Sequence, residues 1–239
     1  MYKLLLDIGN TSLKAAVADG YKILTIRRSE DFRPEFLRPL VEQYRLAAAI
    51  VSSVRGDGVQ TTEWLRTYID KVWMLSHKTP IPIRNCYATP ASLGVDRLAT
   101  AVGAATFFPQ RECLIIDCGT AMTIDLLSAA GEFLGGNISP GLQMRFKALH
   151  SFTAALPLGY AGSHTPPVGG NTQEAVEAGV VQGAVNELEG YLTQYPACTP
   201  VFTGGDAFYF AERIKKPIFV IANLNFIGLA KIVEHNVHI

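Results

Sequence analysis

The chain opens with Leu4-Leu5-Leu6-Asp7-Ile8-Gly9-Asn10-Thr11-Ser12-Leu13-Lys14. An apolar run leads into an aspartate, a turn is favoured at Gly9-Asn10-Thr11, and an alternating run carries Lys14. We interpret this stretch as a hairpin that gathers a carboxylate, small hydroxyl groups, backbone amides and an ammonium group. Glycine there lets backbone amides approach phosphate oxygens, which predicts a phosphate site. An ordinary turn is the alternative, because Asp, Gly and Asn favour turns by themselves.

The same pattern recurs at Cys113-Leu114-Ile115-Ile116-Asp117-Cys118-Gly119-Thr120-Ala121-Met122-Thr123. Asp117 and Gly119 have the spacing of Asp7 and Gly9, and each copy follows an apolar run. A pattern that repeats with its flanking strands indicates a duplicated half-chain. The repeat therefore favours phosphate binding over two unrelated turns.

Three strands in a meander are expected at residues 4–27 and again at 113–138. Beyond each meander, strand-like and helix-like segments alternate, which implies parallel pairing and the α/β class. We therefore expect two domains, residues 1–111 and 112–239, each a mixed sheet flanked by helices. Clefts between such domains favour ligands. The pattern leaves open whether the last helix packs back on the first domain.

Helices are expected where apolar residues recur at helical spacing, and these ranges are 33–46, 58–68, 91–107, 140–153, 171–195 and a last helix from residue 224. Residues 79–90 carry three prolines and no period, which predicts an extended linker. Residues 156–171 are rich in Gly and Pro, which predicts a mobile loop. The aromatic residues Phe32, Phe36 and Trp64 are expected in the core.

The 239 residues carry 21 basic and 21 acidic side chains with no basic run, so nucleic acid is a poor candidate partner. The four cysteines form no CxxC pair and are expected to be reduced thiols, which fits the cytoplasm. The run Leu4-Leu5-Leu6 is too short for a signal peptide, and no window is long enough to span a membrane. We predict a soluble cytoplasmic protein.

Gly94-Val95-Asp96-Arg97 is expected at the start of a helix. Asp96 could accept a hydroxyl proton, and Arg97 could bind an anionic group with its forked guanidinium. A solvated charge pair on an amphipathic helix is the alternative, and the four residues alone favour it.

Five blocks together resemble the actin-like ATPases and the acetate and sugar kinases, and more closely the type III pantothenate kinase family, over nearly the whole chain. The blocks are Asp7–Thr11, Gly94–Arg97, Asp117–Thr123, Gly135–Gly141 and Thr203–Ala207. The resemblance implies a duplicated actin-like, ribonuclease H-like fold that binds ATP between its two domains. Leu98 departs from the tryptophan expected after the Asp-Arg pair, which would alter packing beneath the pocket.

The resemblance implies that Gly94, Val95, Asp96 and Arg97 bind pantothenate, with Asp96 as the general base and Arg97 on the carboxylate. An aspartate ordinarily has a pKa of about 3.9, far below that of an alkanol, so it would orient the hydroxyl and take the proton late. Tyr87 and Thr172 match substrate-site residues, although Tyr87 could equally cover the core edge and Thr172 lies beside a helix cap.

The remaining implied ligands are ATP with magnesium and a monovalent cation, potassium or ammonium, at Asp117. The implied ATP-binding residues are the first hairpin and one threonine of the second: Asp7, Ile8, Gly9, Asn10, Thr11, Ser12, Leu13, Lys14 and Thr120. Gly204-Gly205 would approach the adenosine, or else form a plain strand-to-helix turn. A homodimer that completes the pantothenate pocket across its interface is also implied.

The predicted function is ATP-dependent phosphorylation of pantothenate to 4′-phosphopantothenate, the first step of coenzyme A biosynthesis. One alternative is another small-molecule kinase of the same superfamily. The other is a nucleotide-gated regulatory protein without chemistry, which could tolerate the loss of Asp96.

Overall fold

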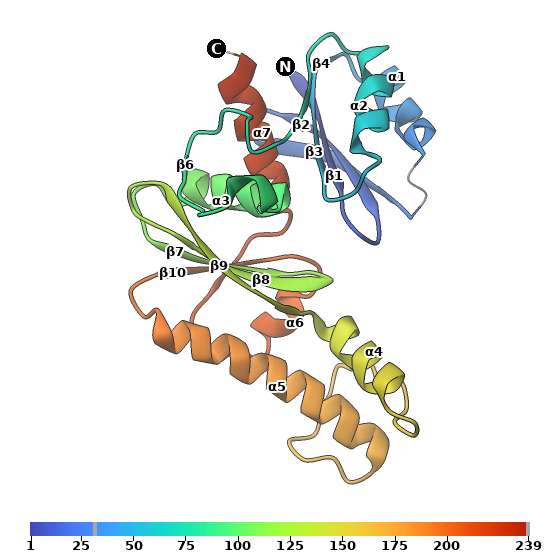
Figure 1. The fold of residues 1–239 in the computed structure, drawn as a ribbon, viewed down its shortest axis with the longest axis vertical. Helices are drawn as coiled ribbons and strands as arrows, with labels where there is room; N and C mark the ends of the chain where they lie inside the picture. The colour runs from blue at the N-terminus through green and yellow to red at the C-terminus, as the bar shows by residue number, and fades with distance from the viewer. Residues whose placement is uncertain (31–32, 238–239) are drawn as a thin grey trace. The chain divides into compact units, whose positions relative to one another are not determined.

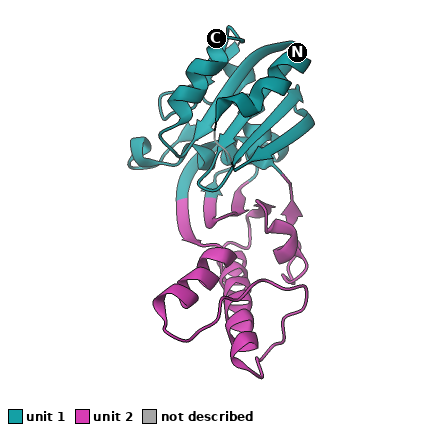
Figure 2. Ribbon diagram, turned by 90° about the vertical axis from the view of Figure 1, so that its right-hand side faces the viewer, with its two compact units in different colours: residues 1–111, 126–135, 223–239 teal, residues 112–125, 136–222 magenta. Residues whose placement is uncertain are grey.

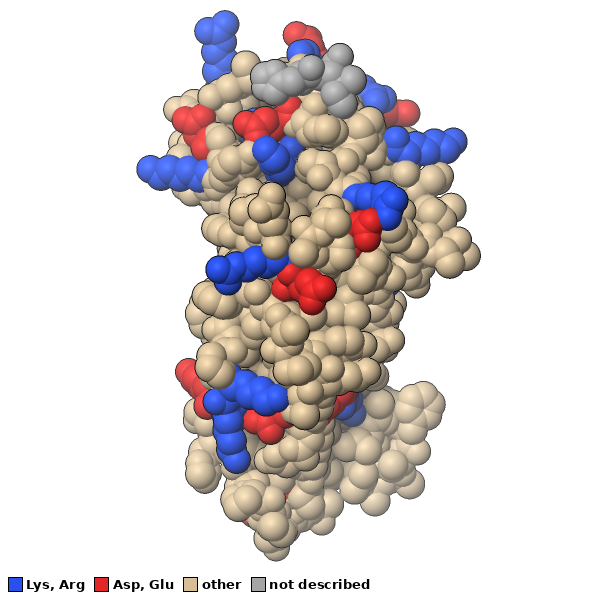
Figure 3. All heavy atoms as spheres, turned by 90° about the vertical axis from the view of Figure 1, so that its left-hand side faces the viewer, with Lys and Arg blue, Asp and Glu red and all other residues tan. Residues whose placement is uncertain are grey.

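A computed structural model of the chain describes residues 1–30 and 33–237, which form two compact units (Figure 2). Unit 1 contains residues 1–111, 126–135 and 223–239, and unit 2 contains residues 112–125 and 136–222. Phe36 and Trp64 pack against the core of unit 1, whereas Phe32 lies outside the described residues. Basic and acidic side chains are interspersed on the face shown in Figure 3.

Unit 1 contains a five-stranded sheet in the order β3-β2-β1-β4-β5. The strands are β1 (Tyr2–Ile8), β2 (Leu13–Asp19), β3 (Lys22–Ser29), β4 (Leu46–Ser53) and β5 (Val72–Met74). The first three pair antiparallel, and β4 and β5 add in parallel, as the sequence predicts. Leu4, Leu5 and Leu6 are fully buried because β1 is the central strand and has a neighbour on each side.

The predicted helix at residues 33–46 is wrong in its extent. The segment forms a 3-10 turn, η1 (Pro34–Leu37), and a short helix, α1 (Arg38–Gln43), before β4 begins at Leu46. Pro34 and Pro39 each lie in a first turn, where the missing N–H is tolerated, and each restarts the helix. The next helix, α2 (Gly58–Arg66), lies within its predicted range.

Two further differences occur at residues 79–92. The expected linker contains a strand, β6 (Arg84–Asn85), which pairs in parallel with Glu132 and Phe133. Such pairing depends on distant residues, so the local pattern could not show it. A 3-10 turn, η2 (Pro90–Ser92), then precedes α3 (Val95–Phe107), so the α-helix starts four residues later than predicted.

The last helix, α7 (Leu224–Val237), packs beside α3 in unit 1 (Figure 1). Glycines allow this close approach. A Cβ on Gly228 would lie 1.7 Å from the carbonyl oxygen of Ala99, and one on Gly103 would lie 2.4 Å from that of Leu224. The helix backbones therefore meet directly, which fixes the N-terminal turns of both helices against the sheet.

The second sheet has the order β11-β10-β7-β8-β9-β6. Its strands besides β6 are β7 (Cys113–Cys118), β8 (Ala121–Leu127), β9 (Glu132–Pro140), β10 (Thr199–Thr203) and β11 (Phe219–Val220). The order β9-β8-β7-β10-β11 repeats the order β3-β2-β1-β4-β5 of unit 1, so the predicted duplicated α/β fold is confirmed.

Unit 2 also contains α4 (Leu142–Phe152), α5 (Thr172–Gln194) and α6 (Ala207–Ala211). The side chain of Asn171 accepts a hydrogen bond from the Glu174 N–H at 3.0 Å and caps α5. Residues 156–171 form no helix or strand, but Arg213 donates to the carbonyls of Gly162 and Ser163 at 3.2 and 2.8 Å. No helix within residues 1–30 and 33–237 is long and apolar enough to cross a membrane.

Candidate active site

The first hairpin has the predicted form. Asp7 is paired in register with Lys14 across β1 and β2, and the Gly9 N–H donates to the Ser12 carbonyl at 3.1 Å. Asn10 and Thr11 are exposed at the turn. The side chains of the other members of the predicted ATP set, Ile8, Ser12 and Leu13, are buried, so a ligand could meet these residues only through their backbone.

Asp7 is the charged centre of this hairpin. Its pKa is raised to about 6, mainly by burial and less by the nearby Asp96, while Lys14 and the hydrogen bond from Asn225 act in the opposite direction. The side-chain amide of Asn225 donates to Oδ2 of Asp7 at 2.8 Å. Asn225 was missed by the sequence analysis because one polar residue in the first turn of a helix carries no recognisable signal.

Gly94 is the N-cap residue of α3, and Asp96 and Arg97 lie in its first turn. Oδ1 of Asp96 accepts a hydrogen bond from the Arg97 N–H at 2.9 Å. A Cβ on Gly94 would lie 2.5 Å from the same oxygen, so glycine lets the carboxylate fold back over the helix start. The N-terminus of a helix is a favourable place for a negatively charged group.

Arg97 contacts two neighbouring aromatic rings of unit 1, whose centres lie 6.2 Å apart. Its guanidinium carbon is 5.6 Å from the ring centre of Tyr87 and 5.7 Å from that of Phe133. Only 6% of Arg97 is exposed, so the alternative of a solvated charge pair is wrong for this residue. The Tyr87 N–H donates to the side chain of Asn85 at 3.0 Å, next to the pairing of β6 with β9. The sequence analysis missed Phe133 and Asn85, since only the β6–β9 pairing brings them here.

The second hairpin carries Asp117 at the end of β7 in unit 2. A Cβ on Gly204, whose φ is +91°, would lie 2.4 Å from Oδ1 of Asp117. Burial and the negative charges of Asp117 and Asp206 raise the pKa of the Cys118 thiol well above its usual value. Two acidic groups, Asp117 and Asp206, therefore act on the end of β7.

Two other predicted residues lie in unit 2. Thr120 is exposed at the tip of the second hairpin, and a Cβ on Gly141 would lie 2.6 Å from its carbonyl oxygen. Thr172 is the exposed first residue of α5, and its neighbour Asn171 supplies the cap instead. The described residues hold no group of three or more His, Cys, Asp or Glu side chains that could bind a metal ion.

The fold has the arrangement of the actin-like ATPases and sugar kinases. It matches an activator of 2-hydroxyisocaproyl-CoA dehydratase from Clostridium difficile, solved with bound ADPNP (TM-score 0.56, 16% identity, covering 100% of this chain and 98% of that one). It also matches a protein from Listeria monocytogenes assigned as an N-acetylmannosamine kinase (0.52, 14%, covering 100% and 99%). A Campylobacter jejuni protein assigned to the Baf family of transcriptional activators gives 0.64 and 22% identity over 99% and 100% of the two chains. At these identities the matches show the fold alone.

The particular family follows from sequence. The type III pantothenate kinase family model matches residues 3–194. Proteins named type III pantothenate kinase from Phocaeicola vulgatus and Porphyromonas gingivalis are each 38% identical, covering 98% and 99% of both chains, respectively. One from Cytophaga hutchinsonii is 39% identical over 98% of this chain and 99% of its own. The chain belongs to the type III pantothenate kinase family and is an enzyme of the kinase class, which confirms the sequence-based identification.

Proposed function

We propose that this chain transfers the terminal phosphoryl group of ATP to the terminal hydroxyl of pantothenate, which forms 4′-phosphopantothenate and begins coenzyme A biosynthesis. The observation that supports this most directly is the first turn of α3. It carries the carboxylate of Asp96, which accepts the Arg97 backbone N–H, and the next side chain is the guanidinium of Arg97, in a chain of this family. A substrate with a hydroxyl at one end and a carboxylate at the other suits that pair.

Asp96 would accept the hydrogen of the pantothenate hydroxyl and orient its oxygen. One carboxylate oxygen already accepts the Arg97 N–H, which fixes the orientation of the group. Because phosphoryl transfer depends mainly on positioning and electrostatics, a fixed weak base is sufficient and need not hold a full alkoxide.

Arg97 would bind the pantothenate carboxylate, and the adjacent Tyr87 and Phe133 rings would keep its planar guanidinium in one orientation. Gly94 and Val95 would line the same site from the start of the helix. Thr172 is also proposed to contact pantothenate, in a homodimer whose pantothenate pocket is completed across the interface.

The first hairpin would bind ATP and its magnesium. The residues fit such a ligand, since the turn is exposed and a Cβ on Gly9 would have its nearest neighbour at 3.6 Å, the carbonyl oxygen of Ser12. Bound ATP with magnesium supplies the activated phosphoryl group. Lys14 balances the negative charge of Asp7, and the backbone amides of the turn would donate to phosphate oxygens. Thr120 would donate its hydroxyl to phosphate from the second hairpin.

Asp117 would hold a monovalent cation, potassium or ammonium. The two acidic groups that act on the end of β7 support a cation there, and a carboxylate with backbone carbonyls is a typical oxygen ligand set for a hard cation. The same proposal includes a homodimer and a cytoplasmic location.

An ATP-consumption assay with and without pantothenate tests the proposed function, run in potassium and again in sodium. We expect consumption that depends on pantothenate and is faster in potassium. A protein that consumes no ATP with pantothenate in either salt would disprove the function. Sugars and acetate in the same assay test the other kinases of the superfamily.

Asp96→Asn tests the catalytic role. We expect turnover to fall roughly 10²–10⁴-fold, the range for losing a general base, while ATP binding by calorimetry is retained. The exposed Asp70 gives the matched control, Asp70→Asn, which should keep normal turnover. Normal turnover in Asp96→Asn would remove Asp96 from the mechanism.

A further inference from the structure

We infer that Asn225 is a positioning residue, which holds the carboxylate of Asp7 in its working orientation from the first turn of α7. This inference rests on the proposed function, since it concerns how the first hairpin is kept ready for ATP. The contact links residues 218 positions apart, at 2.8 Å between the amide nitrogen of Asn225 and Oδ2 of Asp7.

The orientation of the Asn225 side chain is itself fixed. Its amide oxygen accepts a hydrogen bond from the Phe226 N–H at 2.9 Å, so the amide nitrogen is the atom that faces Asp7. Asn225 is partly buried, whereas both of its neighbours, Leu224 and Phe226, are fully buried. The flanking side chains therefore anchor this turn in the core and leave Asn225 directed at the hairpin.

The rest of α7 keeps that turn in place. The contact of Gly228 with Ala99 fixes the helix against α3, whose first turn carries Asp96. The first turns of α3 and α7 both act on the carboxylate of Asp7: the negative charge of Asp96 raises its pKa, and the hydrogen bond from Asn225 lowers it. Rigid support of this kind is what a precisely placed functional group requires.

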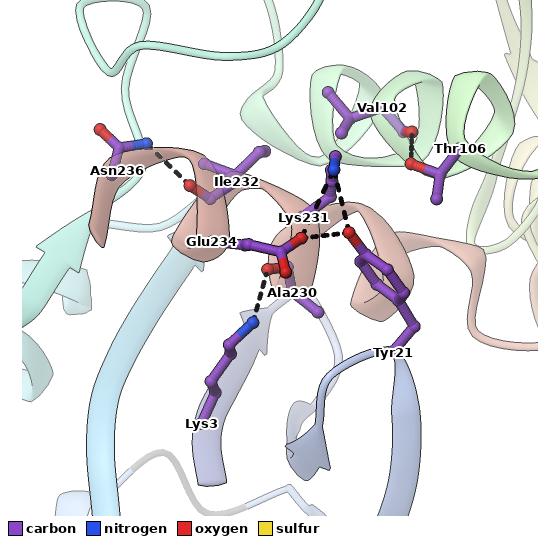
Figure 4. A network of polar contacts seen from close by, with 9 residues as sticks. All are labelled: Lys3, Tyr21, Val102, Thr106, Ala230, Lys231, Ile232, Glu234 and Asn236. Atoms are coloured by element: carbon purple, nitrogen blue, oxygen red, sulfur yellow. Dashed lines mark hydrogen bonds and ion pairs between the residues drawn. The ribbon is translucent and has the colours of Figure 1, made fainter. Parts of the chain in front are cut away.

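Polar contacts hold the C-terminal half of α7 to the strands of unit 1 (Figure 4). Lys3 of β1 donates to the Ala230 carbonyl at 3.4 Å. Tyr21, beside β3, donates to Glu234, and Lys231 donates to the Tyr21 hydroxyl at 3.0 Å. These contacts join the C-terminal half of α7 to the same meander that Asn225 contacts through Asp7, so both ends of the helix are attached to it.

The alternative is that Asn225 only stabilises the start of α7. Asn236 provides a matched control, because it lies in the last turn of the same helix and its side-chain amide donates to the carbonyls of Pro80 and Ile232. Removing an amide donor at either position should weaken α7, but only Asn225 contacts Asp7.

The test compares Asn225→Leu with Asn236→Leu. Leucine has the same branched arrangement of side-chain atoms as asparagine, but it can neither donate nor accept a hydrogen bond. For Asn225→Leu we expect kcat to fall about 10-fold, typical of losing a hydrogen bond to a charged group, with the pantothenate KM changed less than 2-fold. Asn236→Leu should stay within 2-fold of the original kcat. An unchanged kcat in Asn225→Leu, or an equal loss in Asn236→Leu, would overturn the inference.

A second measurement needs no activity. Urea unfolding midpoints of Asn225→Leu, Asp7→Ala and the double variant, without ligand, report the coupling between the two side chains. We expect Asn225→Leu to shift the midpoint at least twice as far in the original chain as in Asp7→Ala, and equal shifts would overturn the inference. Failure of the original chain to consume ATP with pantothenate would disprove the proposed function alone, since the unfolding cycle would still test the contact.

Discussion

The second strand of the unit 1 hairpin carries a basic side chain, Lys14, whereas the second strand of the unit 2 hairpin carries no basic residue. Lys14 is paired in register with Asp7, while β8 has the sequence Ala-Met-Thr-Ile-Asp-Leu-Leu. The aspartates occupy the same place, one residue before the end of β1 and of β7. The difference teaches that a duplicated hairpin can keep its acidic residue and change the charges around it, which supports the two roles proposed above, phosphate binding at the first hairpin and cation binding at the second.

The two hairpins also differ in what lies behind them. A side chain, that of Asn225, supports Asp7, whereas backbone packs against the second hairpin at Gly141 and Gly204. A Cβ on Gly141 would lie 2.3 Å from the Gly119 carbonyl oxygen, but one on Gly9 would meet nothing nearer than 3.6 Å. The hairpin glycines themselves are alike, since a Cβ on Gly119 would have its nearest neighbour at 3.4 Å, so the difference lies in the backbone of Gly141, which packs directly against the second hairpin.

The largest expected effect tests this difference in packing by adding a methyl group at a glycine of each region. Gly141→Ala should lower the free energy of unfolding by about 2–4 kcal/mol, because the new methyl group meets backbone that cannot move aside. Gly9→Ala should change it by less than about 1 kcal/mol and weaken ATP binding instead. Urea unfolding and calorimetric titration with ATP measure the two quantities. Equal losses of stability would show that the hairpins are packed alike.

The next effect is the pH dependence of stability that arises from the buried carboxylate of Asp7. The pKa of Asp7 is raised from 3.8 to about 6, so between these values the folded chain keeps a proton that the unfolded chain has lost. The free energy of unfolding therefore falls as pH rises from about 4 to about 6. One pKa unit is worth about 1.4 kcal/mol, so the ionised carboxylate costs about 3 kcal/mol at pH 7.

Asp7→Asn should accordingly be more stable than the original chain at pH 7 by up to about 3 kcal/mol and should lose kinase activity. Urea unfolding at pH 4, 5, 6 and 7 measures the slope, and Asp70→Asn, at an exposed position, should retain it. If Asp7→Asn kept the original pH slope, another group would be responsible for it.

The smallest effect concerns the cation. Asp117→Asn should lose most of the rate difference between potassium and sodium, a change of about 10-fold or about 1.4 kcal/mol, because one charged oxygen ligand becomes neutral. Initial rates at a series of potassium concentrations measure it. A variant that is still activated by potassium would place the cation at other ligands.

Several residues of the candidate site could be proposed from the sequence because their signals are local. Asp7 with Gly9 and Asp117 with Gly119 stand at matching offsets, and Asp96 with Arg97 follows a glycine at a helix start. Periodicity also located most strands and the long helix α5, since burial of one face imposes a regular spacing of apolar residues. These features need no knowledge of distant contacts.

The contacts that complete the site depend on residues far apart in the chain. Asn225 reaches Asp7, and Phe133 reaches Arg97, only after α7 has packed on α3 and β6 has paired with β9. The sequence by itself determined the duplicated fold, the two acidic hairpins and the family, because strand periods and glycine turns are properties of short segments. Only the tertiary structure decided which groups contact Asp7, Asp117 and Arg97. Hydrogen bonds and ring contacts depend on distances that are set only when the helices and strands have packed together.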